Sequence, residues 1–142
     1  MDGETVMKYP IFFVSTLIVC AAVDFVWLTV MKDRLYAPVM GDMLAAEPRL
    51  PVAVAFYLLY ATGVTIFVGA PALASGAWSK ATASGALFGL FCYMTYDLTN
   101  QATLRDWSLQ LTLADIAWGM FLTALSGTVA FFVTRAFSPA EK

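Results

Sequence analysis

Histidine is missing from the 142-residue sequence altogether. Histidine is a common protein ligand of haem iron and zinc, and its side chain changes charge most readily near neutral pH. Its absence excludes bis-histidine haem, histidine-ligated zinc and catalysis through a histidine proton shuttle. We expect no cofactor and no metal site in this chain.

Charged residues are also scarce, at 13% of the chain, whereas hydrophobic residues make up 61%. A soluble domain is typically near half apolar and a quarter charged. A deviation of this size indicates a membrane protein. The formal net charge of −2 says little about partners, because most charges lie in short connections. We expect no nucleic-acid partner.

Cysteine occurs only twice, as Cys20 and Cys92, and both residues fall within apolar stretches. A free cysteine in such surroundings behaves as a small hydrophobic side chain. We therefore expect these two residues to contribute packing rather than redox chemistry.

Long apolar stretches are what the sequence has in abundance. Each is close to the roughly 20 residues that a helix needs to cross the hydrocarbon core of a membrane. The four stretches are Pro10–Met31, Val52–Ala70, Lys80–Asp97 and Leu109–Val133. They predict an all-α, polytopic membrane protein in which residues 1–142 form a single four-transmembrane-helix bundle.

The first stretch is expected to be a retained span. The preceding residues, MDGETVMKYP, contain two acids and one lysine. A secretory signal peptide instead begins with a positively charged region and has a shorter apolar segment.

The long connection between the first two stretches has an amphipathic pattern. Its apolar residues recur every three to four positions: Leu35, Tyr36, Val39, Met40, Met43 and Leu44. This spacing favours a short interfacial helix over residues 35–46, and a plain linker is the alternative.

Four spans place both termini and residues 69–79 on one side of the membrane, and residues 32–51 and 99–108 on the other. Lysine and arginine divide equally between the two sides. The positive-inside rule therefore gives no orientation. We expect cytoplasmic termini, because small polytopic proteins with short N-termini often insert that way.

Three aspartates converge when the alternating directions of the spans are followed. Asp24 lies late in the first span, Asp97 closes the third and Asp115 lies early in the fourth. All three fall in the membrane half that faces the long connection. A central intramembrane acid costs about 2.5–3.5 kcal/mol on insertion scales. We therefore predict that these acids face the bundle interior.

Two of these aspartates belong to a repeated motif. DFVW runs from Asp24 to Trp27, and DIAW runs from Asp115 to Trp118. Carboxylate and indole share a helix face at this spacing. In antiparallel spans each indole N–H would meet the carboxylate of the other helix. The motif predicts either a structural clamp or one wall of a functional cavity, and the two can coexist.

Asp97 closes its helix, where a negative charge opposes the helix dipole. The nearest cation in the sequence is Arg105. The two residues predict either an ion pair that fixes the loop or an anion or headgroup site that contains Arg105.

Gly85 and Gly89 have the GxxxG spacing that lets helices approach closely. Close packing within one chain is the favoured interpretation. Oligomerisation through Gly85 and Gly89 is the alternative.

The stretches TYDLTNQATLRDW and LTLADIAWG resemble segments of a known protein family. With DFVWL, FYLLYATG and PALASGAW, they are similar to an uncharacterised bacterial family of four-span membrane proteins, domain of unknown function 2177. The resemblance implies a bacterial inner-membrane location. Genes of the family often lie near genes of lipid-modifying enzymes, which implies a role in membrane-lipid handling. The family's pattern singles out Asp24, Trp27, Tyr96, Asp97, Asn100, Arg105, Asp115 and Trp118.

The predicted site is a polar cavity in one leaflet. Its candidate binding residues are Asp24, Trp27, Tyr57, Tyr60, Tyr93, Tyr96, Asp97, Asn100, Arg105, Asp115 and Trp118. We expect a protein accessory to membrane-lipid or apolar-metabolite handling, with membrane lipids and a membrane enzyme as partners. The alternatives are a proton-coupled transporter, a structural subunit, and, less favoured, an enzyme with an aspartate as general acid or base.

Overall fold

The computed structural model describes residues 3–138 of the chain, and it describes side chains from residue 7 onward. This part of the chain is built of helices and contains no strand. The long helices are α1 (Gly3–Met31), α3 (Leu50–Val64), α5 (Trp78–Thr103) and α6 (Leu109–Phe137). α1, α5 and α6 contain three of the predicted apolar stretches, and the second stretch begins in α3 and continues beyond it. The all-α membrane class is confirmed.

The helix that begins with α1 does not end at Met31. It continues through a π-helical turn, η1 (Lys32–Tyr36), into α2 (Ala37–Met40) and a 3-10 turn, η2 (Gly41–Met43). Helical turns therefore cover part of the connection in which we predicted a separate helix. Leu35 is buried there against Trp107 and Leu111, so this segment packs onto the start of α6.

The second apolar stretch also forms one long helix with a change of winding. α3 passes through a π-helical turn, η3 (Thr65–Gly69), into α4 (Ala70–Ser75). Pro71 lies in the first turn of α4, where its missing N–H breaks the regular hydrogen-bond ladder. A Cβ at Gly69 would lie 2.6 Å from the ring of Phe12, so the absence of a side chain lets α1 approach closely.

α5 and α6 form the closest helix pair. Ala81, Gly85 and Gly89 lie along one face of α5 and are buried. A Cβ at Gly85 would lie 2.9 Å from the carbonyl oxygen of Thr123, and one at Gly89 would overlap the carbonyl of Gly119. The GxxxG spacing therefore brings two helices of the same chain together, which was the favoured interpretation.

Among the described residues, three helices are long and apolar enough to cross a membrane: Met7–Met43, Leu50–Ser75 and Leu109–Phe137. α5 is a fourth helix of 26 residues, roughly 39 Å long at 1.5 Å per residue. Its second half is less apolar because it contains Asp97, Asn100 and Gln101.

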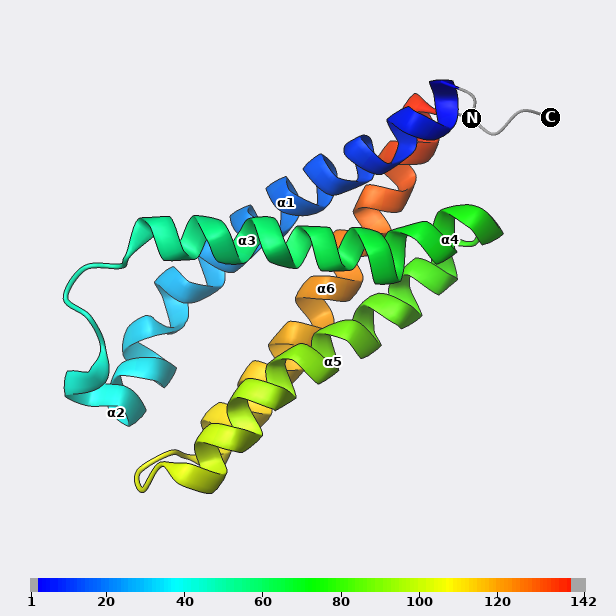
Figure 1. The fold of residues 1–142 in the computed structure, drawn as a ribbon. Helices are drawn as coiled ribbons and strands as arrows, with labels where there is room; N and C mark the ends of the chain where they lie inside the picture. Colours follow the sequence, from blue (N-terminus) through cyan, green and yellow to red (C-terminus); the bar gives the residue numbers. More distant parts are fainter. Residues whose placement is uncertain (1–2, 139–142) are drawn as a thin grey trace.

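The four long helices are not all packed side by side (Figure 1). α6 packs against both α1 and α5, whereas α5 meets the second long helix through η3 and α4. α3 crosses the bundle and diverges from α5 toward the end that holds α2 (Figure 1). We call this end, which also contains the α5–α6 connection (residues 104–108), the α2 end.

The close approach of α5 and α6 predicts a specific effect of one methyl group. Gly89→Ala should lower the free energy of unfolding by about 1–3 kcal/mol, because its Cβ meets backbone that cannot move aside. The measurement is thermal unfolding in mild detergent, followed by circular dichroism.

The matched control is Gly63→Ala on α3. There the new Cβ would lie 3.0 Å from the outer end of the Phe88 ring, which can shift. This variant should change stability little. Equal stability of the two variants would contradict the packing described for Gly89.

Candidate functional site

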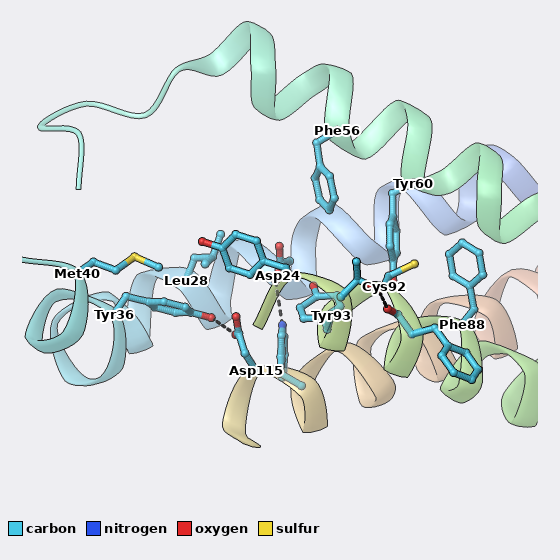
Figure 2. Close-up of a pocket in the computed structure, with 14 residues that line it drawn as sticks. Asp24, Leu28, Tyr36, Met40, Phe56, Tyr60, Phe88, Cys92, Tyr93 and Asp115 are labelled. Carbon is cyan, nitrogen blue, oxygen red and sulfur yellow. Dashed lines mark hydrogen bonds between the residues drawn. The ribbon is translucent and has the colours of Figure 1, made fainter. Parts of the chain in front are cut away.

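A cavity of about 780 Å³ lies in the α2 half of the bundle, where α3 and α5 diverge. Its walls come from α1, η1, α2, α3, α5 and α6 (Figure 2). Six of the predicted site residues line it: Asp24, Tyr60, Tyr93, Tyr96, Asp115 and Trp118. The other lining residues are Leu28, Tyr36, Met40, Phe56, Phe88, Phe91, Cys92 and Thr95.

Asp24 joins three helices at the inner wall of the cavity. Its side chain on α1 is only 6% exposed. Oδ1 accepts a hydrogen bond of 2.9 Å from Nε1 of Trp118 on α6, and Oδ2 accepts one of 2.7 Å from the hydroxyl of Tyr57 on α3. Both oxygens are thus satisfied by the protein, although Tyr57 itself does not line the cavity.

Asp115 is held in a different way. It is also 6% exposed, and its Oδ1 accepts a hydrogen bond from the hydroxyl of Tyr36 on η1. That hydroxyl in turn accepts a 2.9 Å hydrogen bond from Nε1 of Trp27. Figure 2 shows the Tyr36 side chain reaching toward Asp115 across the cavity wall.

The two indoles of the repeated motif lie directly on each other. The rings of Trp27 and Trp118 are parallel within 9°, and their centroids are 4.2 Å apart. Stacked aromatic pairs contribute about 0.5–1.5 kcal/mol beyond their buried area. The crossed contacts predicted from the motif are thus present directly for Trp118 and Asp24, and through Tyr36 for Trp27 and Asp115.

Asp97 does not line the cavity. It is fully buried, and neither carboxylate oxygen has a hydrogen-bond partner within the described residues. Because Gly89 lies against Gly119 and Gly85 against Thr123, the antiparallel register places Asp97 opposite Leu111, one turn before Asp115.

The predicted ion pair of Asp97 with Arg105 is not formed. Arg105 is exposed in the α5–α6 connection, and Asp97 is buried without a partner. Arg105 and Asn100 lie outside the cavity lining, as does Trp27, which contacts the lining through Trp118 and Tyr36.

The three aspartates share one end of the bundle without forming one cluster. Within residues 3–138, no group of three acidic or cysteine side chains is close enough to hold a metal ion. Asp24 and Asp115 lie at the cavity wall, and Asp97 lies between α5 and α6.

Most of the cavity wall is apolar, in contrast to the polar cavity predicted from the sequence. Phe56 extends from α3, and Phe88 and Phe91 from α5. The hydroxyl of Tyr60 is within 2.7 Å of Thr123 Oγ1, so it is already hydrogen-bonded inside the protein. The carboxylates of Asp24 and Asp115 therefore lie among mainly aromatic side chains.

Several lining residues were absent from the sequence prediction, above all Tyr36, Met40 and Cys92. A signal existed for the first two, because both belong to the apolar face of the connection that packs toward the bundle. For Cys92, the only signal in the sequence was its position one residue before the predicted site residue Tyr93.

The double support of Asp24 predicts non-additive loss of stability. Trp118→Phe and Tyr57→Phe each remove one donor to Asp24. Tyr57→Phe should lower the free energy of unfolding by about 1 kcal/mol, and Trp118→Phe should lower it by more, because it also replaces the indole stacked on Trp27. The double variant should lose more than the sum, because a buried carboxylate then has neither donor. Thermal unfolding in mild detergent measures all three variants.

Tyr9→Phe is the matched control, because Tyr9 is exposed on α1 far from the cavity. It should leave stability unchanged. Strict additivity of the two substitutions would show that the two donors act independently of a shared carboxylate.

Comparison with known proteins agrees with the resemblance noted in the sequence. No curated protein and no solved structure matches the chain. A family model described as "Predicted membrane protein (DUF2177)" matches residues 9–132. Since this match covers most of the 142 residues, the chain belongs to this family of membrane proteins.

Proposed function

We propose that this protein binds an apolar molecule from the bilayer in the cavity beside Asp24 and Asp115, as an accessory to membrane-lipid or apolar-metabolite handling. The observation that carries the proposal is a largely apolar cavity with two buried carboxylates on its inner wall. Ligand pockets in proteins typically have volumes of about 300–1,000 Å³ and a few polar groups that fix orientation. The volume of about 780 Å³ falls in this range.

The exposure of the lining residues supports entry from the side. Phe56 of α3 is 45% exposed and Phe91 of α5 is 59% exposed, although both line the cavity. The mouth therefore lies between α3 and α5. Leu59 and Leu87 on the same two helices are also exposed and apolar. The mouth therefore opens toward the acyl chains of membrane lipids.

We also propose that the chain crosses the membrane four times. α5 packs along α6 from Ala81 to Asp97, so a membrane that α6 crosses is crossed by α5 as well. Asp97 and the nearby polar residues would be shielded by α6 rather than by lipid. We place the protein in the bacterial plasma (inner) membrane, with cytoplasmic termini and the cavity in the opposite leaflet half.

The position of the polar groups favours binding over proton transport. Trp27, Tyr36 and Asp115 form a hydrogen-bonded series at the α2 end, and Asp24 lies close beside it. Transport coupled to protons requires groups that communicate with both faces, and substrate sites of transporters usually lie near the midplane. A membrane enzyme that takes up or delivers the bound molecule is the partner we propose, with exposed Arg105 at the same end.

Filling the cavity should abolish ligand retention. Cys92→Trp puts a large ring into the cavity from α5, where Cys92 is a lining residue. Native mass spectrometry from mild detergent should detect an apolar molecule bound to the unsubstituted protein and none bound to this variant.

Ile18→Trp adds the same ring to the exposed face of α1, where Ile18 does not line the cavity, and serves as the control. It should retain the molecule. Loss of the molecule from both variants, or its absence from the unsubstituted protein in native membranes and detergent alike, would contradict the proposed function.

A further inference from the structure

The charges at the cavity wall are all of one sign. Asp24 and Asp115 line the cavity, whereas no lysine or arginine within the described residues 7–138 does so. Lys32 and Arg34, the cations nearest in sequence to the lining residues, are exposed on η1 and are not part of the lining. A ligand in this cavity therefore meets carboxylate and hydroxyl oxygens and finds no cationic side chain with which to form an ion pair.

The two carboxylates differ in how much hydrogen-bonding capacity they have left. Asp24 accepts from Trp118 on one oxygen and from Tyr57 on the other. The hydrogen bond that the protein gives Asp115 goes to Oδ1, from Tyr36. A carboxylate offers about four acceptor positions on its two oxygens. Among the described residues no hydrogen bond reaches Oδ2 of Asp115, so this lining residue has acceptor capacity to spare.

We propose, building on the function proposed above, that the bound molecule carries a hydrogen-bond-donating head, a hydroxyl or an amine, which Asp115 accepts. A phosphate or carboxylate head is a poor match for this wall because of its charge. An anion at this wall would approach a carboxylate inside an apolar surround with no cation to offset the repulsion. A donor head instead completes the hydrogen bonding of Asp115, and an amine adds opposite charge.

Three amphiphiles with the same apolar chain separate these heads: hexadecanol, hexadecylamine and hexadecyl phosphate. The readout is protection of Cys92 from a maleimide in mild detergent at pH 7. Cys92 is exposed and lines the cavity, whereas the other cysteine, Cys20, is buried. The thiol that reacts therefore reports directly on whether the cavity is occupied.

The alcohol or the amine should protect Cys92 at concentrations at least about tenfold lower than the phosphate. The stronger protection of Cys92 by either the alcohol or the amine identifies the head as a hydroxyl or as an amine. Equal protection by all three compounds would overturn the inference about the head and leave the proposed function standing. Preference for the phosphate would also overturn it. Absence of protection by any of them would contradict the proposed function itself.

Asp115→Asn tests the residue assigned to the head, with Asp33→Asn as the control. Asp33 is an exposed acid in η1, close in sequence to the site but outside the cavity. The Asp115 variant should reduce the advantage of the amine over the phosphate by at least about tenfold, and the control should keep it. An unchanged advantage in a folded Asp115 variant would overturn the assignment. If this variant does not fold, the comparison of heads on the unsubstituted protein still decides the inference.

Discussion

The stacked pair of Trp27 and Trp118 is the contact on which the α2 half of the bundle depends. It joins α1 to α6, and each indole N–H continues into the hydrogen bonding of an aspartate. Stacked rings fix the register of two helices in lipid, where apolar residues gain little by meeting one another rather than acyl chains. The carboxylates of Asp24 and Asp115 are therefore held at defined positions by a contact that is itself apolar.

Asp24 and Asp115 have different roles in this arrangement. Asp24 is satisfied by donors from α3 and α6, so it acts as a junction of three helices. Within the part of the chain that the structure describes, Asp115 accepts from one donor, Tyr36, which comes from the turn that continues α1. The cavity between α3 and α5 thus has one acid that belongs to the scaffold and one that is available to a ligand. We regard this difference as the basis of the proposed binding function.

The sequence predicted the architecture well because membrane helices follow from apolar length and from internally satisfied backbone. The contact of Asp24 with Trp118 also followed from spacing and antiparallel direction. Tyr36 was missed, because its place between Trp27 and Asp115 depends on how Leu35 packs against Trp107. Asp97 was assigned to the cavity although it lies eight residues beyond Gly89, on the same helix face. That spacing indicated burial against α6.

We propose that the cavity selects a molecule from the surrounding bilayer. Photo-crosslinking in native membranes tests it most directly, with a photoreactive phenylalanine derivative placed at Phe88 inside the cavity or at Phe25 on the exposed face of α1. We predict that position 88 captures one apolar species strongly enriched over its share of the membrane, while position 25 captures bulk lipids. Capture of the same bulk lipid mixture at both positions would contradict the account.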